Sequence, residues 1–125
     1  MQVMAIVATG FVALLHVYIM VLEMFLWDTP KGRKTFNLTP EFAAASRVLA
    51  ANQGLYNGFL AAGLIWGLWL GPVGWSIQVF FLSCVVVAGV YGAMTANRRI
   101  LFVQALPGLI ALVLVLWSRA PAQAG

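Results

Sequence analysis

The sequence predicts an all-α integral membrane protein, a four-helix bundle that crosses the bilayer with both termini outside the cytoplasm. Of its 125 residues, 63% are hydrophobic and only 8% are charged, whereas soluble domains carry roughly 25% charged residues. The apolar residues gather in four runs, and each run is long enough to cross a hydrocarbon core of about 30 Å. The composition therefore excludes a soluble globule, and the length suits a single domain, 1–125.

The four runs are separated by clear breaks. The predicted spans are approximately Val3–Trp27, Val48–Leu70, Trp75–Ala96 and Ile100–Ser118. The segment Gly71-Pro72-Val73-Gly74 predicts a tight turn between the second and third spans. The segment Asn97-Arg98-Arg99 separates the third span from the fourth.

The loop between the first two spans contains a helix start. Thr39 suits the N-cap and Pro40 the first helical position. We therefore expect a short helix that begins at Thr39-Pro40-Glu41 and runs through Arg47 into the second span.

The basic residues predict the orientation. The loops between spans one and two and between spans three and four lie on the same side, and they hold Lys31, Arg33, Lys34, Arg47, Arg98 and Arg99. The opposite side holds only Arg119. Because Lys and Arg concentrate in cytoplasmic loops, we expect a multi-pass membrane protein with these two loops in the cytoplasm and both termini outside it. The net charge of +4 is then explained by orientation in a lipid bilayer, and no nucleic-acid partner is expected.

Glu23 is the most informative residue for function. A charged acid at the centre of a spanning helix costs roughly 2.5–3.5 kcal/mol, and less near its ends. Glu23 should therefore face protein or a wet cavity near the cytoplasmic end of its span, on the same helix face as His16. Polar side chains lie at similar depth in the other spans. The ligand-binding candidates are His16, Glu23, Arg47, Asn52, Gln53, Tyr56, Asn57, Tyr91, Gln104, Arg98 and Arg99.

Two interpretations of these residues remain open at this stage. They form either an interhelical hydrogen-bond network or a cytoplasm-facing pocket for a small molecule or ion. Glu23 is either neutral and bonded to Asn52 or Gln53, or ionised against Arg47, Arg98 or Arg99. One His and one Cys provide no metal-ligand spacing, so no metal is expected. No nucleophile or phosphate-loop motif assigns catalytic residues or a cofactor, which both stay unknown.

Small residues four apart predict close helix packing. The second span contains Gly54 and Gly58, then Gly63, Gly67 and Gly71, and the third contains Ala88/Gly92 and Gly89/Ala93. Such stripes serve either packing within the monomer or a homo-oligomer, a dimer or a trimer. Pro107-Gly108 predicts a kink in the fourth span that frees the carbonyl of Val103.

Four segments carry a family resemblance: 16–27 (HVYIMVLEMFLW), 51–63 (ANQGLYNGFLAAG), 87–93 (VAGVYGA) and 103–108 (VQALPG). Together they closely resemble a family of small bacterial four-helix membrane proteins, domain of unknown function thirteen-oh-four. The match covers nearly the whole chain. The resemblance implies an inner-membrane protein of four helices and implies no particular activity.

A more distant similarity is to the membrane-associated eicosanoid and glutathione metabolism proteins, four-helix chains that form trimers. Their second helix carries an Arg, then an Asn, then a Glu three residues later. Arg47 and Asn52 match the first two, but Leu55 stands in place of the Glu. The similarity implies that Arg47, Asn52, Tyr56, Arg98 and Arg99 bind an anionic thiol, and the missing Glu puts glutathione chemistry in doubt.

The function that the sequence favours is a cytoplasm-facing polar pocket that binds a small molecule. One alternative is a structural or accessory subunit of a membrane complex, and a second is a glutathione-type transferase-like enzyme. A third is a small proton-coupled exporter, since such exporters have one acid in their first helix. Two features count against the exporter: its acid lies nearer mid-membrane, and dual-topology versions need balanced Lys and Arg.

Overall fold

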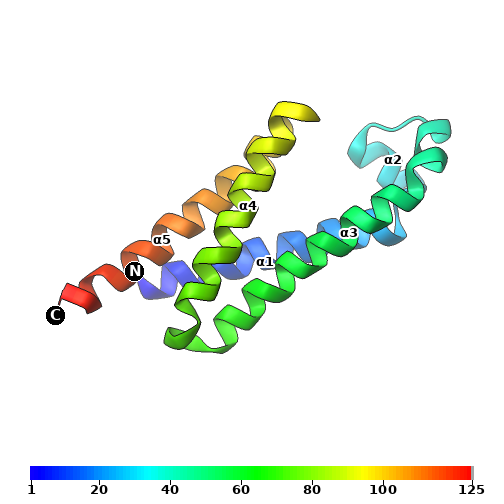
Figure 1. The fold of residues 1–125 in the computed structure, drawn as a ribbon. Coiled ribbons are helices and arrows are strands. Elements are labelled where there is room, and N and C mark those ends of the chain that lie inside the picture. The colour runs from blue at the N-terminus through cyan, green and yellow to red at the C-terminus, as the bar shows by residue number, and fades with distance from the viewer. Residues whose placement is uncertain (125) are drawn as a thin grey trace. The chain divides into compact units, whose positions relative to one another are not determined.

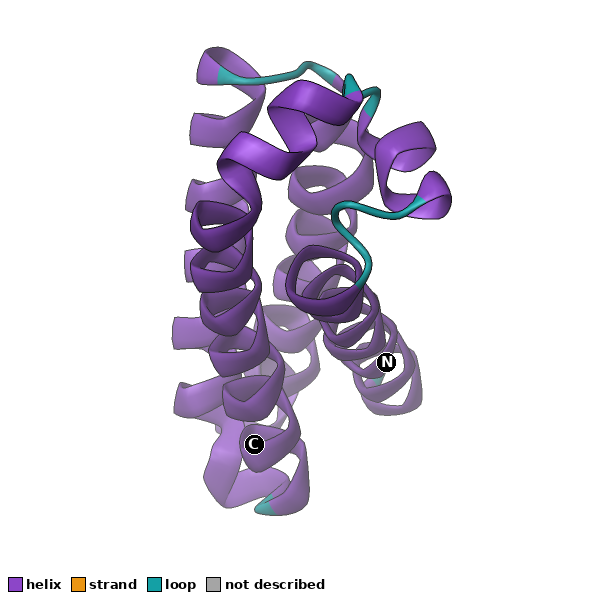
Figure 2. Ribbon diagram, turned by 90° about the vertical axis from the view of Figure 1, so that its right-hand side faces the viewer, coloured by secondary structure: helices purple, strands orange, loops and turns teal. Residues whose placement is uncertain are grey.

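Every regular element of the computed structural model is helical in the residues it describes, 1–124, with side chains described for 1–118 (Figures 1 and 2). The elements in order are α1 (Gln2–Phe25), α2 (Pro30–Phe36), α3 (Pro40–Trp69), the 3₁₀ turn η1 (Gly71–Gly74), α4 (Trp75–Thr95), the π-turn η2 (Leu101–Ala105) and α5 (Leu106–Ala124). The all-α class predicted from the sequence is thus confirmed.

The chain divides into two compact units. Residues 14–61 form one, which we call the loop unit because it contains α2 and its flanking turns. Residues 1–13 and 62–125 form the other, which we call the hairpin unit after α4 and α5. Helices α1 and α3 each contribute residues to both units.

Three helical segments are long and apolar enough to cross a membrane: Gln2–Phe25, Gly71–Thr95 and Leu101–Ser118. They correspond to the first, third and fourth predicted spans. The second predicted span, Val48–Leu70, lies within α3 and is not among these segments in the described part of the chain. Its first turns contain Asn52, Gln53 and Asn57, whose side-chain amides lower its mean hydropathy.

Two Thr-Pro pairs begin the helices of the loop unit. Thr39 accepts a hydrogen bond from the backbone N–H of Phe42 at 3.2 Å, as predicted for an N-cap. The helix that follows is not short, because α3 continues without a break for 30 residues. Thr29 caps α2 in the same way by accepting from the N–H of Gly32 at 3.3 Å. Helix α2 was not predicted, although Thr29-Pro30 repeats the start signal of α3.

Two features of the hairpin unit follow from glycine and proline. Gly71 adopts φ 63° in the turn that leads to α4, a conformation that suits a residue without a Cβ. Near Pro107, where a kink was predicted, the structure has the π-turn Leu101–Ala105, which ends two residues before the proline. The N–H of Leu106 there donates to the carbonyl of Leu101. Proline has no backbone N–H, so it cannot donate a hydrogen bond to the carbonyl one turn earlier. The π-turn lies just before the position of this missing hydrogen bond.

Several glycines of the predicted small-residue stripes pack closely within the chain, although a Cβ on Gly71 would meet nothing within 4 Å. In the hairpin unit, a Cβ on Gly89 would lie 2.7 Å from the backbone N of Ala105, and one on Gly63 would lie 2.4 Å from the ring of Phe81. In the loop unit, a Cβ on Gly58 would lie 2.7 Å from the sulfur of Met20. These glycines therefore serve close packing inside each unit, and an oligomer formed through the stripes stays a prediction.

Replacement of Gly89 by Ala should destabilise the protein by about 1–3 kcal/mol, because a buried methyl group would be forced against the Ala105 backbone. The matched control is Gly10→Ala, since a Cβ at Gly10 meets no atom within 4 Å. In a helix this change should stabilise by about 0.5–1 kcal/mol. Unfolding in detergent followed by circular dichroism measures both variants. Equal effects of the two would contradict the packing described.

Candidate functional site

The buried stripe of α1 carries three polar side chains spaced seven residues apart: Thr9, His16 and Glu23. His16 is fully buried and Glu23 is 8% exposed. The prediction placed these two on one face, and it missed Thr9. The Thr9 hydroxyl is also fully buried and has no hydrogen-bond partner among the described residues. The seven-residue spacing before His16 is the signal that would have identified Thr9.

Glu23 is held by Asn57. The side-chain amide of Asn57 donates to Glu23 Oε1 at 2.5 Å, and both residues are only 8% exposed. The helices approach closely here because Gly54, one turn before Asn57, has no side chain. A Cβ on Gly54 would lie 3.0 Å from Glu23 Cβ. The carboxylate is thus paired with a neutral donor inside the loop unit.

The hydrogen-bond partner of Glu23 was predicted wrongly. Asn52 and Gln53 are both exposed, and Asn52 donates to the carbonyl of Val48 in its own helix. The buried residues of α3 in this unit are instead Ala43, Ala50, Gly54, Asn57 and Ala61. Pairing of Glu23 with an arginine is not observed either. The ion pair in the described part of the chain joins Arg33 to Asp28.

A pocket of about 540 Å³ lies where α1 ends and α3 begins. It is lined by Met24, Phe25, Trp27, Asp28, Thr29, Arg47, Val48, Ala51, Asn52 and Leu55. Arg47, Ala51 and Leu55 are four residues apart, as are Val48 and Asn52, so one face of α3 forms a wall. The pocket includes two predicted candidates, Arg47 and Asn52. The sequence analysis did not identify the residues at the end of α1 or the apolar residues of α3 that line the pocket. The periodicity of one helix does not show which segment lies opposite it.

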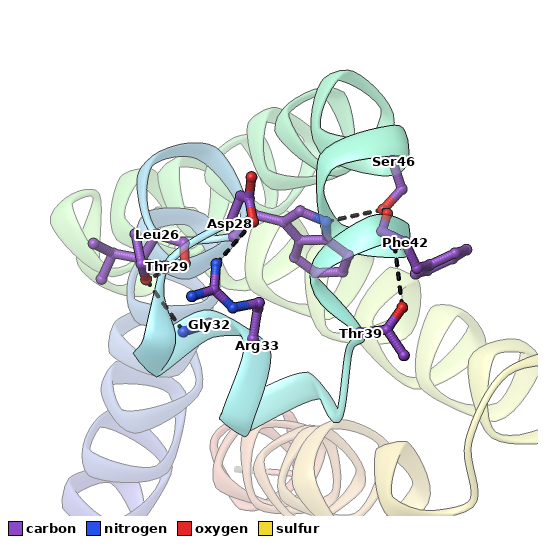
Figure 3. Close-up of polar contacts among 9 residues, drawn as sticks. Leu26, Asp28, Thr29, Gly32, Arg33, Thr39, Phe42 and Ser46 are labelled. Carbon is purple, nitrogen blue, oxygen red and sulfur yellow. Dashed lines mark hydrogen bonds and ion pairs between the residues drawn. The ribbon is translucent and has the colours of Figure 1, made fainter.

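Contacts from the loop between α1 and α3 fix the polar groups of the pocket (Figure 3). Asp28 forms its ion pair with Arg33 at 2.9 Å. The indole N–H of Trp27 donates to Ser46 Oγ at 3.0 Å, and the Trp27 ring lies 4.8 Å from that of Phe36. The Thr29 hydroxyl donates to the carbonyl of Leu26 at 2.6 Å. The carboxylate charge at the pocket is therefore already compensated by a residue outside it.

The remaining candidates do not join this site. Gln53 and Tyr56 are exposed on α3 of the loop unit. Tyr91, Arg98 and Arg99 are exposed in the hairpin unit, where Gln104 is half-buried in the π-turn. In the described residues, no three His, Cys, Asp or Glu side chains are grouped as a metal site. Of the predicted candidates, Glu23 is therefore hydrogen-bonded to Asn57, and Arg47 and Asn52 both line the pocket.

The hairpin unit has a cavity of a different kind. It measures about 590 Å³ and is lined by apolar side chains alone: Val3, Met4, Val7, Ala8, Phe11, Leu106, Pro107, Ile110 and Leu114. Because it offers no polar group to orient a ligand, we take the pocket of the loop unit as the candidate site.

Replacement of Asn57 by Ala should cost roughly 1–3 kcal/mol of stability, because it leaves a buried carboxyl group without its donor. Glu23→Gln should cost less, below about 1 kcal/mol, since the glutamine carbonyl still accepts from Asn57. Thermal unfolding in detergent measures these differences. Asn52→Ala is the matched control, because Asn52 is exposed on the same helix, and an equal cost at both positions would contradict the assigned role of Asn57.

Comparison with known proteins identifies the family. Residues 10–116 match the family described as "Protein of unknown function (DUF1304)". A protein of Lactococcus lactis described as "Uncharacterized protein YpaA" is 31% identical over 115 residues, which cover 90% of this chain and 97% of that protein. No solved structure matches the chain. The similarity to eicosanoid and glutathione metabolism proteins stays a prediction. Because the match extends over most of its length, the chain belongs to the DUF1304 family.

Proposed function

We propose that this protein is a four-span protein of the bacterial inner membrane that binds a small molecule at its cytoplasmic side. The observation that carries the proposal is the pocket of the loop unit, in which Arg47 and Asn52 lie beside an apolar wall. Its volume of about 540 Å³ is within the range of roughly 300–1,000 Å³ that is typical of ligand pockets.

The proposal treats α3 as the second span. Its 30 residues extend about 45 Å at 1.5 Å per residue, more than a hydrocarbon core of about 30 Å requires. Arg47 and Asn52 lie in its first half, where the chain emerges from a loop rich in Lys and Arg. This position supports an interfacial depth for the pocket, where charged side chains cost less than at the membrane centre.

The loop charges support a cytoplasmic location for the pocket. The segments on the side of α2 hold six Lys and Arg residues, against Arg119 alone on the other side. The side chain of Arg119 lies outside the described residues. The Glu23–Asn57 hydrogen bond supports a packing role for Glu23, which favours binding over proton-coupled export.

The pocket can be tested by filling it. Leu55→Trp places a large ring on the wall and should abolish retention of a bound small molecule. Leu49→Trp is the matched control, because Leu49 is an exposed leucine of the same helix that does not line the pocket. Native mass spectrometry of protein released gently from membranes should detect extra bound mass in the wild type and in Leu49→Trp only. The same spectrum for all three would overturn the proposal.

The orientation can be tested by thiol labelling. In a Cys84→Ala background, cysteine replaces either Lys34 in α2 or Val73 in the turn after α3, both exposed. A membrane-impermeant maleimide should label the Val73→Cys variant in intact spheroplasts. It should label the Lys34→Cys variant only after permeabilisation, because the basic loop is cytoplasmic. The reverse pattern would contradict the proposed topology.

A further inference from the structure

We infer that the pocket of the loop unit takes an amphiphile with one apolar chain and an oxyanion head, a carboxylate or a phosphate ester. This inference rests on the proposed function, because it assigns a chemical class to the molecule bound there. Two features carry it: the free polar groups of the pocket, and the apolar surface beside them.

Most polar groups of the pocket already have partners within the chain. Asp28 is paired with Arg33, the Trp27 indole donates to Ser46, and the Thr29 hydroxyl donates to Leu26. Arg47 is exposed, and its guanidinium has no ion pair or hydrogen bond among the described residues. The group left to bind a ligand is therefore a guanidinium, whose planar fork of donors matches the two oxygens of a carboxylate or a phosphate.

Asn52 provides a second, weaker polar group. One of its amide N–H groups is used for the carbonyl of Val48, and an amide has two N–H donors and an acceptor oxygen. One N–H and the oxygen therefore stay available at the pocket. The carboxylate of Asp28 also lines the pocket, but its negative charge is compensated by the ion pair with Arg33. It therefore does not prevent an anion from binding.

The pocket is also lined by apolar side chains from both helices. Met24 and Phe25 come from the end of α1, and Val48, Ala51 and Leu55 come from α3. Along α3 this wall extends about 10 Å from Val48 to Leu55 at 1.5 Å per residue. A free anion would leave this surface wet, and a neutral hydrocarbon would leave the guanidinium without an acceptor. An amphiphile satisfies both surfaces at once.

The experiment is photolabelling of the full chain in nanodiscs with three diazirine probes of equal chain length. One has a carboxylate head, one a phosphate monoester and one an alcohol. Peptide mass spectrometry measures labelling of residues 48–55. Both anionic probes should label this segment in the wild type, and the alcohol should label it at least tenfold less. Arg47→Gln should weaken labelling by the anionic probes roughly 10- to 100-fold, as expected for a lost charge-assisted hydrogen bond.

Two control variants separate the explanations. Arg99→Gln removes an exposed arginine of the hairpin unit and should leave labelling unchanged. Leu55→Trp should abolish labelling by every probe. A melting curve for each variant confirms folding, which Arg47→Gln should preserve because Arg47 has no intramolecular partner.

Each other outcome has a distinct meaning. If the alcohol labels the wild type as strongly as the anions and Arg47→Gln has no effect, the oxyanion class is wrong while the pocket stands. If inorganic phosphate displaces the anionic probes as effectively as unlabelled dodecanoate does, the ligand is a free anion, not an amphiphile. If no probe labels residues 48–55 above the level in Leu55→Trp, this inference fails, whereas the proposed function fails only if native mass spectrometry also detects no bound mass that Leu55→Trp removes.

Discussion

The loop unit depends on the burial of one carboxyl group and on the glycine that makes its burial possible. A buried acid without a hydrogen-bond partner is costly, and more so in a low-dielectric interior. Gly54 removes the side chain that would hold α3 away from Glu23, and Asn57 then reaches the carboxyl group from the next turn. The same close contact sets the rotation of the first half of α3 about its own axis. Once Asn57 faces inward, the directions of the other side chains follow from the helical periodicity.

The pocket is a consequence of this orientation and of unequal helix lengths. Helix α1 ends at Phe25, whereas α3 begins at Pro40 and includes nearly four turns before Gly54. The face of α3 that carries Arg47, Ala51 and Leu55 lies beside the buried face, and part of it borders the pocket at the α1 terminus. The intervening loop uses its polar side chains for caps, for the Asp28–Arg33 pair and for the Trp27–Ser46 hydrogen bond. The Arg47 side chain is left without an ion pair among the described residues.

The hairpin unit is built mainly from apolar packing. Its side chain-to-backbone hydrogen bonds include those from Gln78 to the carbonyl of Gly67 and from Trp75 to the carbonyl of Val115. Gly67, Gly89 and Gly108 admit neighbouring side chains or backbone where a Cβ would collide. Small residues at these positions let the helices approach closely and increase the van der Waals contact between them. The polar chemistry that suggests binding lies in the loop unit.

The sequence by itself determined the all-α class, three segments long and apolar enough to cross a membrane, the capped start of α3 at Thr39 and the turn at Gly71, because apolar run length and cap chemistry are local properties. It also identified Glu23, Arg47 and Asn52 as residues to examine. Only the tertiary structure decided that Asn57 bonds Glu23, since Asn52 and Asn57 carry the same amide and the register of α3 against α1 selects between them. The pocket likewise required tertiary structure, because the two segments that line it are far apart in the sequence. The sequence also could not show that Asp28 pairs with Arg33 and not with Arg47.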